Sequence, residues 1–490
     1  MNNVTRTPAA RAIGPVRADH CAAEPRWPLD GRSALNPDRR FLLAHIQFDK
    51  PIVRASGNHL YDADGNAYLD FLAQYGAIPF GHNPGALWDA VLRVRTNEEP
   101  SLVQPLISPA AEALAAELIA LSPCGPGYVT FTNSGAESVE AAIKLARAKT
   151  GRQLILSTHR GFHGKTLGAL SATGTAMYRT PFLVDTTHFE HVEYGDLDAL
   201  GERLQRGDVA AFIVEPIQGE AGMIVPPPGY LKAAQALCRA AGTLFILDEI
   251  QTGLGRTGRL FAAEHDEIKP DIMLLAKALG GGLVSLGACI CAEKAWSPDF
   301  GLFHSSTFAN NHLSCAIGVA VLAQLLQDDR RLVREVAAKG EHLRRGLERL
   351  VADYPEAFAG ASGQGLMHGL LLTPWHGGDA YFLAHASSTG TAVPLVCGYL
   401  MAAHRILTAP TFNHSGVLRL EPPLTVTIAE IDQLLRALED VAQLITGGDF
   451  GRLLEYITGA PETGATADHP QSFETSTDHG YHQASRAVSR

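Results

Sequence analysis

A lysine and an aspartate each stand at the end of a short apolar run. Lys277 follows "DIMLLA" and Asp248 follows "LFIL", and three glycines come soon after Lys277. A buried ammonium or carboxylate costs several kcal/mol unless something compensates it. Asp248 taken alone could be half of a structural ion pair. Lys277 needs a partner or a covalent modification.

Two further stretches could contact a ligand. In "TNSGAESVEAAIKLAR", Ser134 and Glu137 have the spacing of a capping box at a helix start. The free N–H groups of such a start bind phosphate well, although a well-capped helix is the simpler interpretation of this stretch alone. In "HRGFHGKT", Phe162 could stack on a flat heteroaromatic ring or belong to the core. His163 is more typical of a hydrogen-bonded histidine than of a metal ligand.

Together these residues are the parts of a pyridoxal-phosphate (PLP) site. The helix start would bind the phosphate and the aromatic ring would stack on the cofactor. Lys277 would bind the cofactor's aldehyde covalently, which removes the cost of a permanently buried ammonium. Asp248 would keep the pyridine nitrogen protonated, so that the ring can accept electrons.

Alternating strands and helices must position these residues. Strands are predicted at 128–133, 153–158, 210–216, 244–249 and 271–276, and helices at 137–149 and 230–242. Continuous apolar strands alternating with helices predict an α/β fold with a mainly parallel sheet. Ligands in such sheets bind beyond the carboxyl ends of the strands, where Asp248 and Lys277 stand.

The chain is long enough for more than one domain, with 490 residues of which 46% are hydrophobic. From about residue 328, charged amphipathic helices predict a smaller α+β domain that ends in a helix over 428–445. The predicted organisation is a disordered or loosely packed arm (1–38), a first segment of the small domain (39–95), a large PLP-binding domain (96–327), a C-terminal α+β small domain (328–446) and a polar tail (447–490).

Composition and cysteine usage exclude several partners. The net charge of −11 argues against nucleic acid and membrane surfaces, and no apolar run reaches the length of about 18 residues that indicates a membrane helix. The N-terminus has no hydrophobic region of a secretory signal. Seven sparse cysteines predict reduced thiols and a cytoplasmic protein, with Cys289 and Cys291 in the core. No zinc motif is present, so no metal is expected.

Five motifs resemble one family. "SGAESVEAAIKLAR", "FHGKTLGALSATG", "VEPIQGEAG", "DEIQTGLGRTG" and "LLAKALGGG" stand in the order and at the spacing of class III, fold type I aminotransferases. The resemblance extends from about residue 40 to residue 446. It implies a PLP-dependent transferase with a mainly parallel seven-stranded sheet in its large domain and a smaller α+β domain.

The resemblance implies a role for each motif residue at the cofactor. Lys277 and Asp248 would be catalytic, as the covalent lysine and the partner of the pyridinium. Phe162 and Ile250 would face opposite sides of the ring. The expected cofactor-binding residues are Ser134, Gly135, Ala136, Phe162, His163, Asp248, Ile250, Gln251, Lys277 and Thr307. Thr307 would reach the phosphate of the neighbouring subunit, which implies a homodimer.

The resemblance also implies a substrate-binding end. Arg419 in "VLRLEPPLT" would bind the carboxylate of an amino acid or oxo acid. Glu220 in "QGEAG" would neutralise Arg419 when the substrate lacks that carboxylate. Lys165, where many members have arginine, and Tyr75 complete the expected substrate-binding set. The stretch "HSSTFANNHLSC" departs from the common family pattern HGSTFGGNP.

The stretches "FHGKTLGALSATG", "PPPGYL" and "RLEPPLT" look closest to putrescine and related diamine aminotransferases. We therefore predict a ping-pong transaminase. It would move an amino group between a terminal (omega) amine, such as a diamine or omega-amino acid, and an oxo acid such as 2-oxoglutarate or pyruvate. The open alternatives are an aminotransferase of a specialised-metabolite pathway, an acetylornithine/ornithine type, a mutase or decarboxylase, and a non-catalytic scaffold.

Overall fold

A computed structural model describes residues 48–103, 105–375, 381–414 and 416–458, together with 36, 38, 43, 44 and 46. Nearly all of the predicted N-terminal arm and residues 459–490 of the predicted polar tail lie outside the described residues. In the part that is described, no helix is long and apolar enough to cross a membrane.

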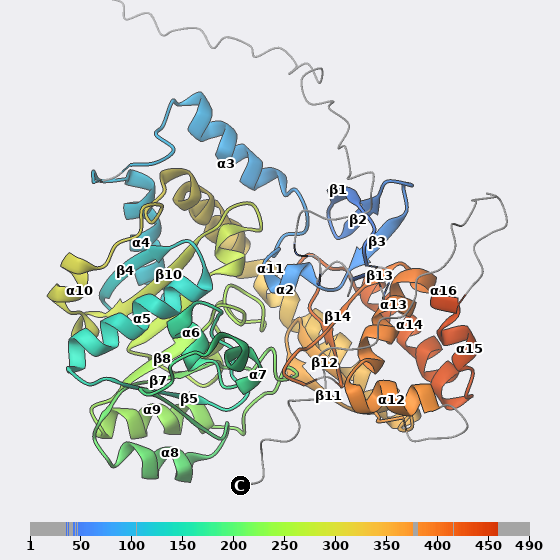
Figure 1. Cartoon of the computed structure of the whole chain (residues 1–490). Coiled ribbons are helices and arrows are strands. Elements are labelled where there is room, and N and C mark those ends of the chain that lie inside the picture. The colour runs from blue at the N-terminus through green and yellow to red at the C-terminus, as the bar shows by residue number, and fades with distance from the viewer. Residues whose placement is uncertain are drawn as a thin grey trace, which may run out of the picture. The chain divides into compact units, whose positions relative to one another are not determined.

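The largest sheet confirms the mainly parallel arrangement (Figure 1). Its seven strands lie in the order β4-β10-β9-β8-β7-β5-β6. Their bounds are β4 (Gly127–Thr132), β5 (Leu154–Thr158), β6 (Phe189–Val192), β7 (Val209–Val214), β8 (Leu244–Asp248), β9 (Ile272–Leu275) and β10 (Gly287–Ala292). β10 is antiparallel to both β4 and β9, and the other pairs are parallel. Cys289 and Cys291 lie in β10 and are buried, as predicted.

Both faces of this sheet are covered by helices, which is why its strands read as continuous apolar runs. Phe245 and Leu247 of β8 belong to one core with side chains of α4, α8, α9 and α11, whereas Ile246 belongs to a second core with α5 and α6. The helical bounds here are α4 (Pro109–Leu121), α5 (Gly135–Thr150), α6 (Leu167–Ala172), α7 (Ala176–Arg179), η2 (Thr180–Phe182), α8 (Leu197–Leu204), α9 (Tyr230–Ala240), η3 (Ala262–His265), η4 (Lys277–Gly280), η5 (Glu293–Ala295) and α10 (Pro298–Phe303).

Two four-stranded sheets lie outside the large sheet. The first has the order β1-β2-β3-β13 and the second β11-β12-β15-β14. Their bounds are β1 (Ile52–Ser56), β2 (His59–Asp62), β3 (Ala67–Asp70), β11 (Phe358–Gln364), β12 (Met367–Leu372), β13 (Ile406–Leu407), β14 (Ala409–Pro410) and β15 (Val417–Leu420). The parallel pairing of β3 with β13 joins segments that are more than 300 residues apart in the sequence.

The remaining helices are α2 (Ala73–Gly76), α3 (Gly85–Thr96), α11 (His312–Asp353), α12 (Tyr381–Thr389), α13 (Ala392–His404), α14 (Ile428–Thr446), α15 (Phe450–Leu453) and α16 (Glu455–Thr458). α14 confirms the predicted C-terminal helix. α11 is interrupted at residues 327–330, close to the predicted domain boundary at 328, and its first half precedes that boundary. Leu453 of α15 is buried, so packed structure continues into the predicted tail.

The short element α2 is a left-handed turn. Ala73, Gln74 and Tyr75 have φ angles of 44°, 52° and 63°, and Gly76 follows at 80°. Such conformations cost about 1–3 kcal/mol for each residue that is not glycine. The buried carboxylate of Asp70 holds the start of the turn, because its Oδ1 accepts hydrogen bonds from the backbone N–H groups of Leu72 and Ala73, each at 2.8 Å.

Candidate active site

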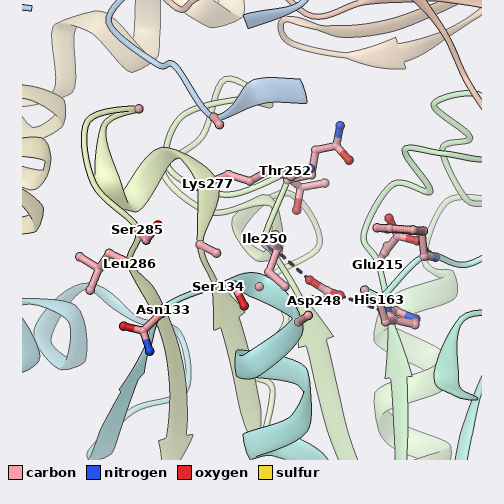
Figure 2. Close-up of a pocket in the computed structure, with 18 of the residues that line it drawn as sticks. Asn133, Ser134, His163, Glu215, Asp248, Ile250, Thr252, Lys277, Ser285 and Leu286 are labelled. Atoms are coloured by element: carbon pink, nitrogen blue, oxygen red, sulfur yellow. Dashed lines mark hydrogen bonds and ion pairs between the residues drawn. The ribbon is translucent and has the colours of Figure 1, made fainter. Parts of the chain in front are cut away.

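A cavity of about 530 Å³ opens where α5 begins and where β8 and β9 end (Figure 2). It is lined by Ala77, Asn133, Ser134, Gly135, Ala136, Phe162, His163, Gly164, Glu215, Asp248, Ile250, Gln251, Thr252, Ala276, Lys277, Gly282, Leu283, Val284, Ser285 and Leu286. Asp248 and Lys277 come from neighbouring parallel strands, so the sheet itself brings the two predicted catalytic residues to one edge.

Asp248 is paired with His163 inside the cavity wall. The two side chains are buried, and His163 Nδ1 lies 2.7 Å from Asp248 Oδ2. Asp248 Oδ1 accepts a hydrogen bond from Ile250 N at 3.1 Å. Burial lowers the pKa of His163, but the hydrogen bond and charge of Asp248, with a smaller contribution from Glu215, outweigh burial and raise it. The pair keeps the Asp248 carboxylate oriented at the strand end.

Glu215 follows β7 directly and lies behind this pair. Its Oε1 accepts a hydrogen bond from Phe162 N at 2.9 Å, and its Oε2 accepts one from Gly219 N at 3.3 Å. Burial raises the pKa of Glu215 from its ordinary value of 4.5 to about 7, and Asp248 contributes in the same direction. Glu215 therefore fixes the loop that presents Phe162 and the loop that leads to Glu220.

Lys277 leaves β9 in a strained conformation. Its φ angle is 42°, in the left-handed region, and its side chain lines the cavity. Non-glycine residues hold such angles only where the surrounding structure requires them. Burial lowers the pKa of Lys277, and the charge of Arg419 acts in the same direction. A lysine of this kind is more readily available as a neutral nucleophile or base than an exposed one.

The start of α5 forms the opposite wall. Ser134 is its N-cap, and the Oγ of Ser134 accepts a hydrogen bond from Glu137 N at 3.2 Å. The predicted capping box is corrected in one respect. Glu137 Oε2 accepts hydrogen bonds from Asn133 N at 2.7 Å and from Asn133 Nδ2 at 2.9 Å, rather than from Ser134 N. A Cβ atom at Gly135 would come within 2.9 Å of Ile250, so any larger residue there would require the Ile250 side chain to shift.

Arg419 and Glu220 form a buried ion pair. Arg419 lies on β15 with a fully buried side chain, and its Nη2 is 2.6 Å from Glu220 Oε1. Glu220 Oε2 accepts a hydrogen bond from Phe412 N at 3.2 Å. The guanidinium carbon of Arg419 lies 5.0 Å from the centre of the Tyr75 ring, so the left-handed turn places an aromatic face against it.

The structure places most, but not all, of the predicted residues together. Nine of the ten predicted cofactor-binding residues line the cavity, and Thr307 is the exception. Thr307 is exposed and does not line the cavity of its own chain. Lys165 is exposed too, and its Nζ lies 5.1 Å from the centre of the Tyr178 ring. Their predicted roles remain predictions.

Sequence reasoning missed several residues of the site, of which Glu215 and Glu421 are the clearest. Each had a signal. Glu215 directly follows a buried strand, as Asp248 does, and Glu421 stands two residues after Arg419, where strand periodicity favours the same face. Sequence reasoning also missed Tyr178, which is close enough to Glu220 to feel its charge. Burial, and then the charge of Glu220, raise the pKa of Tyr178 to about 12.

The residues present fit PLP. The cavity has the size of a small-molecule site, with a lysine, a strand-end carboxylate and a helix start around it. The first N–H groups of a helix have no intrahelical acceptor, and Gly135 lets the backbone approach a phosphate closely. Among the described residues, no group of three or more His, Cys, Asp or Glu side chains could hold a metal ion.

Known proteins resemble this chain in sequence. The family model described as Aminotransferase class-III matches residues 44–442. The putrescine aminotransferase of Pectobacterium atrosepticum is 40% identical over 417 residues, covering 82% of this chain and 85% of that protein. The aminotransferase PigE of a Serratia species is 38% identical over 448 residues, covering 83% of this chain. The 448 aligned residues cover 52% of PigE, so the chain spans about half the length of that relative.

Solved structures share the fold. The ornithine aminotransferase of Toxoplasma gondii superimposes with a TM-score of 0.73 at 30% identity, covering 85% of this chain and 97% of that chain. The acetylornithine aminotransferase of Elizabethkingia anophelis gives a TM-score of 0.65 at 29% identity, covering 80% of this chain and 94% of that chain.

Proposed function

The chain belongs to the class III aminotransferases, and on that premise we propose that it moves an amino group between a terminal amine and an oxo acid. The amine would be a diamine or an omega-amino acid, and the oxo acid 2-oxoglutarate or pyruvate. The relative named putrescine aminotransferase supports this substrate class. The two substrates would react in turn at one site, as a ping-pong mechanism requires.

The family implies PLP, and the residues of the cavity suit it. When bound, PLP supplies an electron sink and carries the amino group from one substrate to the other. Ser134, Gly135 and Ala136 would hold its phosphate, Phe162 and Ile250 its ring, and Asp248 its pyridine nitrogen. Gln251 would lie near its phenolic oxygen.

Lys277 would carry the proton transfer. Its Nζ would take a proton from the substrate carbon that bears the amino group. A lowered pKa makes the neutral amine of Lys277 more available for this step near neutral pH. His163 would keep the Asp248 carboxylate in place, because Asp248 already accepts the Nδ1–H of His163 at 2.7 Å.

The ion pair between Glu220 and Arg419 is the observation that carries the proposal. With Glu220 in place, the substrate end presents little net charge and admits an amine that has no carboxylate. An oxo acid carries a carboxylate beside its reacting carbonyl, and this carboxylate would displace Glu220 and bind Arg419. Guanidinium groups bind carboxylates in a fixed two-pronged geometry.

We also propose a cytoplasmic homodimer in which Thr307 completes the partner's phosphate site. The exposure of Thr307, away from the cavity of its own chain, is consistent with this role. A dimer would show in light scattering. Thr307→Ala should weaken PLP binding without changing the mass of the dimer, and unchanged PLP affinity would remove Thr307 from the site.

A panel of amino donors tests the function. Diamines, omega-amino acids, ornithine and acetylornithine would be offered with pyruvate or 2-oxoglutarate, and the amino acid formed from each oxo acid would be quantified. The proposal expects the diamines to react fastest. Ornithine or acetylornithine as the preferred donor would favour the second candidate, which the structural likeness to those two aminotransferases supports.

A further inference from the structure

A second carboxylate, Glu421, is also bound to Arg419. Its Oε2 lies 3.3 Å from Arg419 Nη1, on the other side of the guanidinium from Glu220, and its side chain is fully buried. The Gln251 amide donates to both of its oxygens, at 3.0 and 2.8 Å. Arg419 Nε is buried with no hydrogen-bond partner among the described residues. The Nε–Nη2 edge, which Glu220 contacts at one atom only, is therefore the edge that can receive a substrate carboxylate.

The two carboxylates differ in freedom to move. The Glu220 side chain is 12% exposed and lies on a loop, whereas the Glu421 side chain is fully buried. The left-handed turn closes over Glu421, since a Cβ atom at Gly76 would lie 2.5 Å from Glu421 Oε1. Glu421 N also donates to Phe71 O at 2.8 Å. Glu220 can leave Arg419, and Glu421 cannot.

Glu421 also faces a second buried arginine. Arg256 Nε lies 4.0 Å from Glu421 Oε1, and Arg256 Nη1 donates to the backbone carbonyls of Leu366 and Pro422. The two arginines and the two glutamates sum to zero charge while Glu220 is in place. When Glu220 leaves, the cluster carries one positive charge. Without Glu421 these two states would carry one and two positive charges.

We propose that Glu421 is a specificity-determining residue: a fixed counter-charge that lets the movement of Glu220 alone switch the substrate end between neutral and singly positive. This proposal rests on the proposed function and deepens it. The neutral state suits the end of an amine that has no carboxylate. The singly positive state suits one carboxylate and no more.

Glu421→Gln tests this proposal, because glutamine keeps the shape and removes the charge. The probe is glutarate, a dicarboxylate with no reactive carbonyl, titrated into the PLP-loaded enzyme by calorimetry. A charge removed a few ångströms from the site changes binding by about tenfold or more. Glutarate should therefore bind the variant at least about tenfold more tightly. The single-turnover rate constant with a diamine, divided by its half-saturating concentration, should fall by a similar factor.

Glu267→Gln, at an exposed surface position, is the matched control and should leave both values unchanged. If Glu421→Gln does not fold, Glu421→Asp carries the test, because its shorter side chain draws the charge away from Arg419. A smaller shift in the same direction is then expected. Glutarate affinity within twofold of the unchanged enzyme in the folded variant overturns the proposal. Failure of every amine to react would instead overturn the proposed function, since glutarate binding needs no turnover.

Discussion

The two ends of the cavity are built in different ways. The cofactor end takes its main groups from the ends of neighbouring strands and the start of one helix, all within residues 133–286. The substrate end joins Tyr75, Glu220, Gln251 and Arg419, which come from separate parts of the chain. The first end follows from the sheet itself. The substrate end depends on the strained turn that carries Tyr75 and on β15, a strand of a different sheet, which carries Arg419.

This difference separates chemistry from selection. Groups on strand ends are held by the backbone ladder, which suits residues that must keep their geometry in every turnover. Groups that meet from distant segments can be exchanged one at a time without disturbing that ladder. The comparison predicts that variants at the cofactor end damage both half-reactions, and that variants at the substrate end damage one.

Lys277→Ala should have the largest effect and abolish turnover with every donor. The variant loses the group that would bind the cofactor covalently and move the proton, while PLP could still bind non-covalently through the start of α5. Product formation and the absorbance of bound PLP would be measured together. Lys232→Ala, at an exposed surface lysine, is the control and should behave like the unchanged enzyme. Normal turnover by Lys277→Ala would contradict the assignment.

Arg419→Ala should raise the activation free energy of the oxo-acid half-reaction by about 2–5 kcal/mol, the range for a lost buried charge pair. The amine half-reaction should suffer much less, because it does not need the guanidinium. Glu220→Ala should do the reverse and weaken discrimination against carboxylates. Single-turnover absorbance changes, with amine alone and then with oxo acid alone, separate the halves. Equal damage to both halves by Arg419→Ala would show that the donor also binds through Arg419.

Asp248→Asn should reduce the single-turnover rate constants of both half-reactions by a factor on the order of 10², comparable to the loss of one electrostatic donor. A neutral amide cannot hold the pyridine nitrogen protonated. The same single-turnover assay applies, with circular dichroism to confirm the fold. A change of only a few-fold would mean that Asp248 serves as the structural partner of His163.

Glu215→Gln should have the smallest effect, on the pH dependence of stability. Because the pKa of Glu215 is raised from 4.5 to about 7, the folded protein keeps a proton that the unfolded chain has lost between these values. Its contribution to stability is complete below about pH 4.5 and is lost as the pH rises through 7. Between pH 5 and pH 7.5, the free energy of unfolding of the glutamine variant should therefore fall by about 2 kcal/mol less than that of the unchanged protein. Urea denaturation at pH 5 and pH 7.5 would measure it. An unchanged decline would place the effect elsewhere, for example at Glu249, whose pKa burial also raises to about 7.

The sequence predicted the cofactor end better than the substrate end, for a physical reason. A charged residue directly after a buried strand is a local signal, and it predicted that Asp248 and Lys277 would stand at strand ends, where both line one cavity. The cluster around Arg419 depends on long-range packing. Tyr75 reaches it only through a left-handed turn whose three non-glycine residues give no local signal. Glu421 could have been predicted from a different signal, the two-residue period of β15. Alternate residues of a strand face the same side, so Glu421 lies beside Arg419.

The pairing of β3 with β13 has a consequence for how each new chain is assembled. A ribosome releases the N-terminal part first, and domains generally fold as they emerge. Every strand of the large sheet has emerged once residue 292 has, so that sheet can close early. The sheet next to the left-handed turn waits for its fourth strand until Leu407 is released, and Arg419 follows later still. Contacts between distant segments form slowly. During synthesis, the strands that carry the cofactor end are therefore released before the residues that select the substrate.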